Sequence, residues 1–265
     1  MYEFNYHKPQ TIQDAVKLFT EVDDGIYRAG GHTLIPSMKV RLRAPTDVID
    51  ISGIDGLSGI NEESGALVIG ALTTHDAVAT SDIVRRAIPA INDLAGGIGD
   101  AQVRNRGTIG GSVANSDPAA DYPAALLGLG ATIRTDRREL NADSFFTGMF
   151  ETALEEDEII QAIELPIVEA AAYVKFPNPA SRYATVGVFV CRHGDEVRVA
   201  ITGAAPSVFR CAEMEEALKK DFSADALANI QLSENDMNSD LHASAQYRAH
   251  LCCVMARRAV TKLTG

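Results

Sequence analysis

Two glycine pairs are the residues of this chain whose type and spacing most directly suggest chemistry. One lies in the string AGGHT (29–33) and the other in the string TIGGS (108–112). Glycine lets the backbone adopt positive φ and lets a ligand approach closely, and exposed N–H groups at such a turn can bind an anion. Two such segments brought together could hold the two phosphates of a dinucleotide. Either pair alone is more often only a tight turn, so that interpretation stays open.

Motifs for several other chemistries do not occur. Gly97, Ile98 and Gly99 are followed by Gln102, where a Rossmann fingerprint would place its third glycine. There is no P-loop, no H-E-x-x-H and no G-x-S-x-G. The histidines are scattered without metal-ligand spacing. We therefore predict no metal site and no catalytic acid, base or nucleophile in this chain.

The cysteines do not suggest a cluster site either. An iron–sulfur cluster requires a grouped set of thiolates, and no C-x-x-C pair is present. If the protein works with such a cluster, the cluster would belong to a partner. The four cysteines, which we predict to be buried or half-buried thiols, are Cys191, Cys211, Cys252 and Cys253.

Composition and charge narrow the class of protein. The 265 residues are 46% hydrophobic and 23% charged, which is typical of a globular chain. The formal net charge of −12 disfavours nucleic acid and anionic membranes as partners. No apolar run approaches the ~18 residues of a transmembrane helix. The first ten residues contain no apolar signal region, so we predict a cytoplasmic location.

The capping residues and the spacing of apolar residues predict the helices and strands that position the first glycine pair. Thr11 is typical of an N-cap, and the helix that it begins is expected to run to about Glu21. Thr73 and Thr74 could cap another short helix. Further helices are predicted at 34–42, 82–94 and 124–129. Strands are predicted at 3–7, 26–29, 47–51, 66–70, 131–134 and 158–165.

The second glycine pair lies in an unusual stretch, residues 96–123. It is rich in Gly, Asn, Asp and Ser, yet apolar at Ile98, Val103, Ile109 and Val113. An exposed loop would be more polar, and long ordered loops are usually functional. We therefore expect a partly buried functional loop here.

A domain boundary is expected near 166–172. Beyond it, residues 184–191 and 197–203 are predicted to form an antiparallel pair joined by a turn at 193–195, with a third strand at 208–211. Helices are predicted at 212–220, 224–230 and 244–263. The last third is thus expected to be a small sheet covered by helices, and the whole chain to be α+β.

Longer strings around these features resemble a known family. The chain is similar over nearly its full length to the FAD-binding medium subunits of the carbon monoxide dehydrogenase and xanthine dehydrogenase (molybdenum hydroxylase) family. The matching strings are AGGHTLIPSMKVRLRAPTDVIDI (29–51), IGDAQVRNRGTIGGSVANSDPAADYPAALLGLGA (98–131), FFTGMFETALEEDEIIQAIELP (145–166) and AYVKFPNPASRYATVGVFV (172–190).

The resemblance implies a fold and a domain division. The expected fold is α+β: a vanillyl-alcohol-oxidase (PCMH) type FAD-binding domain of two subdomains, followed by a small C-terminal domain with an antiparallel sheet. The expected boundaries are 1–168 for the FAD-binding domain, with subdomains of about 1–55 and 56–168, and 169–265 for the C-terminal domain.

The resemblance also implies a set of FAD contacts. The first pyrophosphate segment would be 29–34 and the second 108–111. The segments after these would approach the ribityl chain and flavin, and Lys175 would lie near the polar edge of the flavin. The implied contact residues are Ala29, Gly30, Gly31, His32, Thr33, Leu34, Thr108, Ile109, Gly110, Gly111, Asn115, Ser116, Asp117, Asp121, Tyr122, Ile160 and Lys175.

Some of these residues have other interpretations. Asp117 and Asp121 could equally be caps of the following helix. Lys175 outside this context would be an exposed lysine at a strand end. Arg104 and Arg106 could pair with acidic residues or face a partner, and the sequence does not choose.

The implied function is that of an electron-transfer subunit. One FAD would collect electrons from a small [2Fe-2S] subunit and pass them to an external acceptor, while a large subunit with the molybdenum cofactor oxidises the substrate. A dimer of such heterotrimers is expected. The alternative is a self-contained flavoenzyme with the same FAD fold, and a weaker one is a non-enzymatic nucleotide-binding protein. The substrate and the final acceptor stay open, because neither site is expected on this chain.

Overall fold

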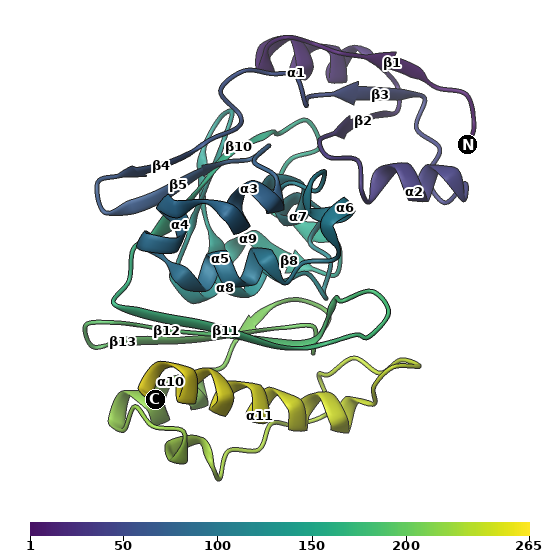
Figure 1. Ribbon diagram of the computed structural model, residues 1–265. Helices are drawn as coiled ribbons and strands as arrows, with labels where there is room; N and C mark the ends of the chain where they lie inside the picture. Colours follow the sequence, from purple (N-terminus) through teal and green to yellow (C-terminus); the bar gives the residue numbers. More distant parts are fainter.

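A three-stranded parallel sheet forms the N-terminal end of the molecule (Figure 1). The structure, a computed structural model, describes residues 1–265. Both outer strands run parallel to the central β3. The elements of this layer are β1 (Asn5–His7), α1 (Ile12–Glu21), β2 (Gly25–Arg28), α2 (Leu34–Lys39) and β3 (Asp47–Asp50).

Helix α1 illustrates how local sequence gives this layer. The hydroxyl of Thr11 accepts a hydrogen bond from the backbone N–H of Asp14 at 3.1 Å, so the predicted cap is confirmed. Ile12, Ala15 and Phe19 recur at helical spacing and face the small core that also contains Ile49.

A five-stranded antiparallel sheet, in the order β4-β5-β10-β6-β7, forms the central layer. Its long strand β10 (Ile160–Pro166) lies between β5 (Ala66–Gly70) and β6 (Thr132–Thr135). The remaining strands are β4 (Ile60–Glu63), β7 (Glu139–Asn141) and the separate hairpin β8 (Phe146–Gly148) and β9 (Glu151–Thr152). The helices of this layer are α3 (His75–Thr80), α4 (Asp82–Ala87), α5 (Pro89–Gly96), α6 (Ala101–Arg104), α7 (Ile109–Asn115), α8 (Tyr122–Leu129) and α9 (Ala142–Phe145).

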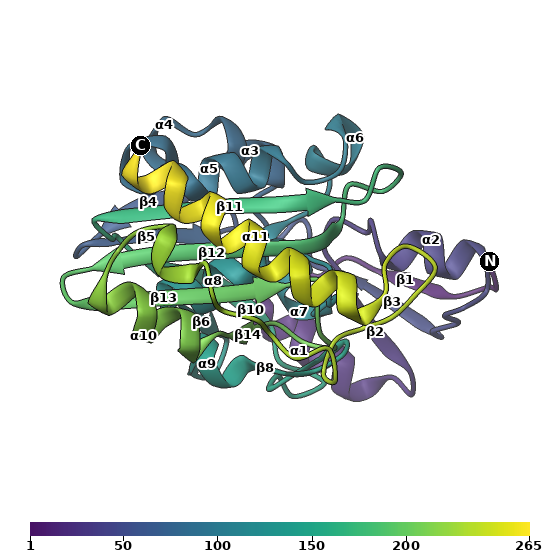
Figure 2. The same ribbon diagram turned by 90° about the horizontal axis from the view of Figure 1, so that it is seen from below.

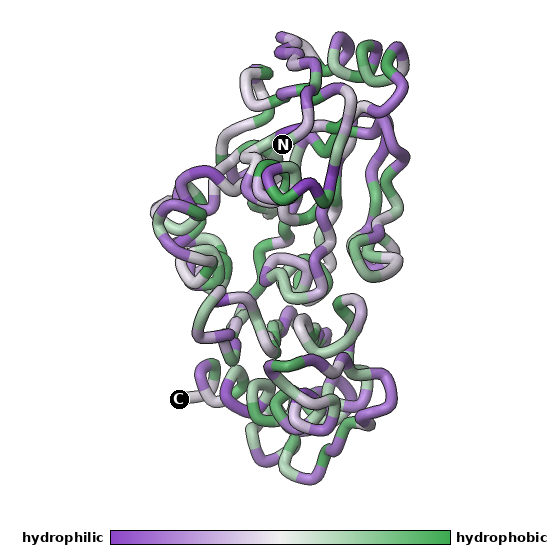
Figure 3. The backbone as a smooth tube through the Cα atoms, turned by 90° about the vertical axis from the view of Figure 1, so that its right-hand side faces the viewer, coloured by the Kyte–Doolittle hydropathy of each residue, from purple (hydrophilic) through white to green (hydrophobic).

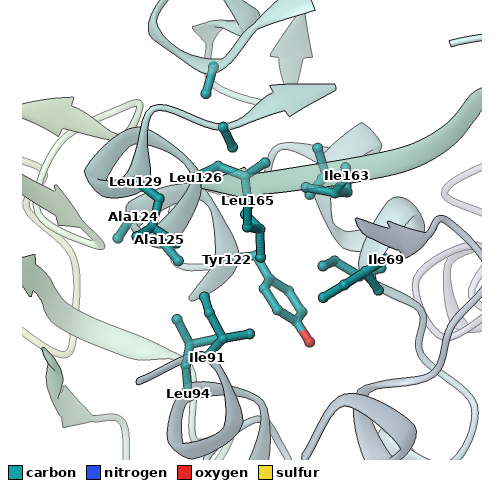
Figure 4. Packing of buried hydrophobic residues seen from close by; sticks show 14 of the residues in the cluster. Ile69, Ile91, Leu94, Tyr122, Ala124, Ala125, Leu126, Leu129, Ile163 and Leu165 are labelled. Carbon is teal, nitrogen blue, oxygen red and sulfur yellow. The ribbon is translucent and has the colours of Figure 1, made fainter. Parts of the chain in front are cut away.

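The largest core lies between this sheet and its helices. Helix α8 is buried along its whole length, since all eight of its residues are inaccessible. Figure 4 shows the ring of Tyr122 between Ile69 and Ile91, with Leu165 nearby. A helix that is apolar all round is typical of such a central position.

The third layer is a four-stranded antiparallel sheet, in the order β11-β12-β13-β14. Figure 2 shows helix α11 crossing β11 and β12 on one face, where α10 packs against β13. Helices α5 and α8 cover the other face. The elements are β11 (Ala170–Pro177), β12 (Ala184–His193), β13 (Glu196–Thr202), β14 (Phe209–Arg210), α10 (Ala212–Lys220), the 3-10 turn η1 (Asp225–Leu227) and α11 (Ala245–Thr264).

Burial on both faces explains the sequence of β12. Its first eight residues, ATVGVFVC, are all buried, and such continuous apolar runs are typical of strands covered on two sides. Phe189 and Cys191 point to the central core, whereas Val188 and Val190 point to the core beneath α10 and α11. In Figure 3 many helices carry both hydrophobic and hydrophilic residues, as expected where one face packs on a core and the other faces solvent.

Three predictions of secondary structure were wrong. The helix predicted over 82–94 is two helices, because Ile88 leaves the helical region before Pro89 begins α5. The stretch 96–123, predicted to be a loop, contains α6, α7 and the start of α8. The helix predicted at 224–230 is only the turn η1. The prediction of buried thiols is confirmed, with Cys253 half-buried and no disulfide present.

Candidate functional site

A cleft of about 1560 Å³ opens between the N-terminal layer and the central layer. It exceeds the roughly 300–1,000 Å³ of ordinary small-molecule sites. Both glycine pairs lie in its wall, together with the segment 150–160 and the loop 181–183. The predicted contact residues that line it are Ala29, Gly30, Gly31, His32, Thr33, Leu34, Thr108, Gly110, Gly111, Asn115, Asp117, Asp121 and Ile160.

The first glycine segment is a turn between β2 and α2. Gly31 has φ of +78°, a conformation that favours glycine. The backbone N–H groups of Gly30, Gly31, His32 and Thr33 donate to no other group of the chain. A turn with several unused N–H donors at a cleft is suited to binding an anion.

An ion pair between Arg28 and Asp50 lies next to this turn. The guanidinium of Arg28 donates to the carboxylate of Asp50 at 2.5 Å, and the hydroxyl of Tyr6 donates to the same carboxylate. These hydrogen bonds, with that from Ser52, hold the pKa of Asp50 below its usual range although burial acts in the other direction. The side chain of Arg28 also lies 3.1 Å from the position that a Cβ on Gly31 would take.

The two glycine segments meet at Gly30. A Cβ built on Gly30 would lie 2.0 Å from the carbonyl oxygen of Arg106 and 3.1 Å from the Cα of Gly107. No side chain can occupy that space. The close approach therefore depends on glycine and brings the turn 29–33 against the start of α7.

The second glycine pair lies in the first turn of α7. Thr108 is the N-cap, and its hydroxyl accepts from the N–H of Gly111 at 3.2 Å. The N–H of Ile109 donates to Thr73, and that of Gly110 donates to Ala71 at 2.8 Å. A Cβ on Gly110 would lie 2.5 Å from that of Ala71.

These bonds correct one expectation. The sequence suggested two backbone cradles for a diphosphate, but the N–H groups of Ile109, Gly110 and Gly111 are already used within the protein. The second pair instead allows α7 to pack closely against Ala71. Only the first segment has a run of consecutive free backbone donors, at residues 30–33.

Four of the implied contact residues lie outside the lining of the cleft. Ile109 is fully buried in the central core. Ser116 is buried and ends α7 in a left-handed conformation, with φ of 45°. Tyr122 begins α8 with its ring in the core. The fourth residue, Lys175, lies behind the wall of the cleft.

Lys175 is held by protein groups. Its ammonium lies 2.9 Å from the nearer carboxylate oxygen of Asp121 and donates to the carbonyl oxygens of Gly97 and Arg182. The hydroxyl of Tyr173 donates to Asp121 at 2.6 Å. Burial raises the pKa of Asp121, and Lys175 and Tyr173 oppose that rise. The alternative of an exposed strand-end lysine is wrong, because the side chain is only 12% exposed.

The interpretation of Asp117 and Asp121 as caps of α8 holds only in part, and only for Asp117. The carboxylate of Asp117 accepts from the N–H of Ala119 at 2.9 Å, two residues ahead of it, which is a local turn rather than a cap of α8. Asp121 precedes α8 but makes no cap hydrogen bond. Burial raises the pKa of Asp117, which lines the cleft.

The two arginines left open by the sequence have different surroundings. The side chain of Arg104 donates to the carbonyl oxygens of Ile98 and Gly99. It therefore braces the turn before α6 instead of pairing with an acid. Arg106 makes no side-chain hydrogen bond or ion pair, and it contributes its carbonyl to the contact with Gly30.

Sequence reasoning missed several residues of the cleft wall. His75 and Gly107 lie between the two glycine segments, and Phe150, Arg182 and Tyr183 lie around the flanking loops. The repeated threonines before His75 were a usable signal, since Thr74 forms a bridge to Thr108. Phe150 left no signal in the sequence, because its exposed ring and its φ of 57° appear only in the fold.

These features fit a dinucleotide with a pyrophosphate: a long cleft, free N–H donors beside it and a close backbone approach at Gly30. Comparison with known proteins agrees. The family described as the FAD binding domain in molybdopterin dehydrogenase matches residues 2–168, and the CO dehydrogenase flavoprotein C-terminal domain matches residues 164–263. The chain belongs to this family of FAD-binding subunits.

Individual relatives span nearly the whole chain. The carbon monoxide dehydrogenase medium chain of Hydrogenophaga pseudoflava is 35% identical, over 97% of this chain and 96% of its own length. The glyceraldehyde dehydrogenase medium chain of Sulfolobus acidocaldarius is 32% identical, over 97% of each chain. These relatives are medium chains of dehydrogenases, so this FAD-binding subunit is an oxidoreductase component.

Solved structures support the fold. Reconstituted CO dehydrogenase from Oligotropha carboxidovorans matches with a TM-score of 0.89 at 35% identity, over 99% of this chain and 98% of the other. Quinoline 2-oxidoreductase from Pseudomonas putida also gives 0.89, at 26% identity, over 99% and 97%. The expected α+β fold and the expected FAD are thus confirmed. No helix of this subunit is both long and apolar enough to cross a membrane.

Proposed function

We propose that this FAD-binding subunit transfers electrons between an iron–sulfur partner and an external acceptor, in a complex whose large subunit holds the molybdenum cofactor. The observation that carries the proposal is the cleft in which the turn 29–33, with its free N–H donors, meets α7. Family membership supports the presence of partners, since the relatives are medium chains. A dimer of heterotrimers and a cytoplasmic location belong to the same proposal.

In this proposal the residues of the chain bind and orient FAD. FAD, when bound, supplies the capacity to accept and release electrons. The N–H groups of Gly30, Gly31, His32 and Thr33 would hold the pyrophosphate, since they have no other partner. Ile160 and Asp117 would line the flavin end, and Asp121 would act there together with the buried Lys175.

The proposal requires no catalytic acid or base in this chain. The proposed task is binding and tuning of the flavin, while substrate chemistry belongs to another subunit. Similarity to relatives does not indicate which substrate the complex oxidises. Relatives named for carbon monoxide, glyceraldehyde and nicotine are almost equally similar, at 35%, 32% and 31% identity.

The division into domains is proposed at 168/169, with the first subdomain ending near 55. The first position lies in the connection between β10 and β11, and the second in the connection between β3 and β4. Limited proteolysis of the subunit should cut at these connections before it cuts inside the three sheets.

The test is purification of the tagged subunit from its native host, followed by a visible spectrum and mass analysis of what co-purifies. Flavin bands together with a large molybdenum subunit and a small iron–sulfur subunit would support the proposal. A lone yellow protein that oxidises a substrate with flavin alone would overturn it and favour a self-contained flavoenzyme.

A partner-dependent measurement separates these outcomes further. In the intact complex, substrate should reduce the flavin. Release of the iron–sulfur subunit should abolish that reduction, and dithionite should still reduce the flavin directly. Flavin reduction by substrate without the iron–sulfur subunit would contradict the relay.

A further inference from the structure

His75 is a buried histidine in the wall of the cleft that has no role in the contacts described so far. It begins helix α3, and its backbone N–H donates to the carbonyl of Gly107 at 2.9 Å. The residue is only 5% exposed, yet it lines the cleft. It therefore stands where the start of α7 meets the turn 29–33.

The two ring nitrogens of His75 have different surroundings. Nδ1 is buried and has no hydrogen-bond partner. Nε2 has no protein partner either, but it is not among the fully buried atoms, so it keeps access to the cleft. Nε2 lies beside Gly107, where an added Cβ would come within 2.6 Å of it. Because Gly107 has no side chain, nothing at that position clashes with Nε2.

A second buried polar atom without a partner belongs to the ring that packs against His75. The hydroxyl of Tyr122 is fully buried and unbonded. The rings of His75 and Tyr122 are 5.5 Å apart between centroids and inclined by 42°. Figure 4 shows the tyrosine ring between the aliphatic side chains of Ile69 and Ile91, which offer no polar group. Buried polar groups without partners are costly, and the ring contact makes these two atoms candidate partners for each other.

The charge state of the imidazole restricts what it can do. Burial lowers the pKa of His75 to about 4, with smaller effects from His32 and Arg104. The ring is therefore neutral at pH 7, with one nitrogen as donor and the other as acceptor. A hydrogen bond at Nδ1 decides which nitrogen carries the proton.

We propose that the Tyr122 hydroxyl donates to Nδ1 of His75 and thereby fixes the Nε2–H tautomer, whose N–H donates to an oxygen of the FAD pyrophosphate. The pyrophosphate is the group in reach because Gly107, next to Nε2, packs against Gly30 in the turn with the free N–H donors. This inference rests on the proposed binding of FAD in the cleft. His75 contacts the cofactor, and Tyr122 is a positioning residue.

The direct test is 15N NMR of the unmodified subunit labelled at histidine. We expect His75 to be in the Nε2–H form without ligand. Its Nε2 resonance should shift on saturation with FAD and also with ADP, which carries the pyrophosphate without the flavin. Riboflavin, which has no phosphate, should leave it unchanged. An Nδ1–H tautomer, or an Nε2 resonance unaffected by saturating FAD, would overturn the inference while FAD binding stands.

Failure of the underlying function has a different signature. If the unmodified subunit does not quench flavin fluorescence and takes up no FAD, both the proposed function and this inference fail.

Matched variants of His75 test the donor position. The amide of His75→Gln lies near the position of Nε2, that of His75→Asn near Nδ1, and His75→Leu has neither. We expect the FAD dissociation constant to rise roughly 10- to 100-fold in the Leu variant, the range expected for a lost hydrogen bond to a charged group. The Asn variant should resemble Leu, and the Gln variant should recover part of the affinity. Equal affinity in all three would contradict the role of Nε2.

Tyr122→Phe tests the positioning role. It keeps the ring in the core and removes only the hydroxyl. We expect His75 to populate both tautomers in the 15N spectrum, and FAD affinity to fall less than in His75→Leu. A variant that still shows the single Nε2–H tautomer would exclude the tyrosine as the group that fixes it.

Discussion

At the scale of single residues, the site depends on where a side chain is missing. Gly30 allows the carbonyl of Arg106 to approach the turn 29–33, and Gly110 allows α7 to approach Ala71. The free N–H donors of the turn would lose their position relative to α7 if either contact opened. The proposed cofactor site therefore depends on two close contacts between backbone segments, at Gly30 and at Gly110, and not on a charged side chain.

Gly30→Ala should weaken FAD binding. The new Cβ would meet the Arg106 carbonyl at 2.0 Å, and overpacking of this kind costs about 1–3 kcal/mol, or roughly five- to 150-fold in affinity where the whole cost falls on binding. The measurement is the FAD dissociation constant from fluorescence quenching.

Gly96→Ala is the matched control for this change. The nearest atom to its Cβ would be that of Ala79 at 3.9 Å, and the position has no positive φ. Affinity for FAD should stay at the level of the unmodified subunit. Equal loss in both variants would show that close approach at Gly30 is not the cause.

At the scale of elements, capping and inter-layer ion pairs hold the wall of the cleft. Thr108 caps α7 and forms the bridge to Thr74, the cap of α3. The pair of Asp121 and Lys175 joins the start of α8 to strand β11. Each contact includes a residue that lines the cleft, Thr108 in the first and Asp121 in the second.

Thr108→Ala should destabilise the fold by about 1 kcal/mol, the usual cost of a lost N-cap. The variant lacks the hydroxyl that accepts a hydrogen bond from the N–H of Gly111 in the unmodified subunit. Thr108→Ser keeps the hydroxyl and should retain most of the stability. The free energy of unfolding from urea denaturation gives both values, and equal destabilisation by Ala and Ser would contradict the capping role.

Lys175→Met should cost more, about 3–5 kcal/mol, because it leaves the buried carboxylate of Asp121 without its cation. The double variant with Asp121→Asn should cost less than the sum of the two single changes. Urea denaturation of the four proteins gives the coupling free energy. Additive effects would mean that the two side chains do not stabilise each other.

At the scale of the whole molecule, the protein and the FAD that it is expected to bind are both negatively charged. The net charge of −12 gives no long-range attraction for FAD. In the proposed binding mode the local arrangement supplies the affinity, through N–H groups of the turn 29–33. The three layers bring that turn, α7 and the loop 181–183 around one cleft.

The acid stability of the molecule should depend on Glu158, a buried side chain in the wall of this cleft. Hydrogen bonds from Arg138, with those from Glu155 and Thr135, lower its pKa to about 2 although burial opposes them. A pKa lowered in the folded state stabilises the fold above the unfolded value of about 4.3, and this contribution disappears as the pH falls toward 2.

Glu158→Gln measures this contribution. The difference in unfolding free energy between the unmodified subunit and the variant should be constant above pH 5 and should shrink between pH 5 and 2. Urea denaturation over this pH range gives the difference. A difference that does not change with pH would rule out an ionised Glu158 as the source.

The sequence by itself determined many of the local elements and the family. Thr11, Ser244 and the run ATVGVFVC specify their helices and strand through capping and through burial on both faces. The strings around the two glycine pairs indicated an FAD-binding subunit, and the family models agree. Local signals of this kind act between residues that are close in the chain, so they can be read from one sequence.

The tertiary structure decided what each glycine pair does and which residues join the site. That the N–H groups of α7 are already bonded to Thr73 and Ala71, while those of the turn 29–33 are free, depends on contacts between distant segments. The same holds for Lys175, whose partners Asp121 and Gly97 lie more than fifty residues away, and for His75 beside Tyr122. Hydrogen bonding and desolvation are fixed only when the layers pack, which is why no local pattern reports them.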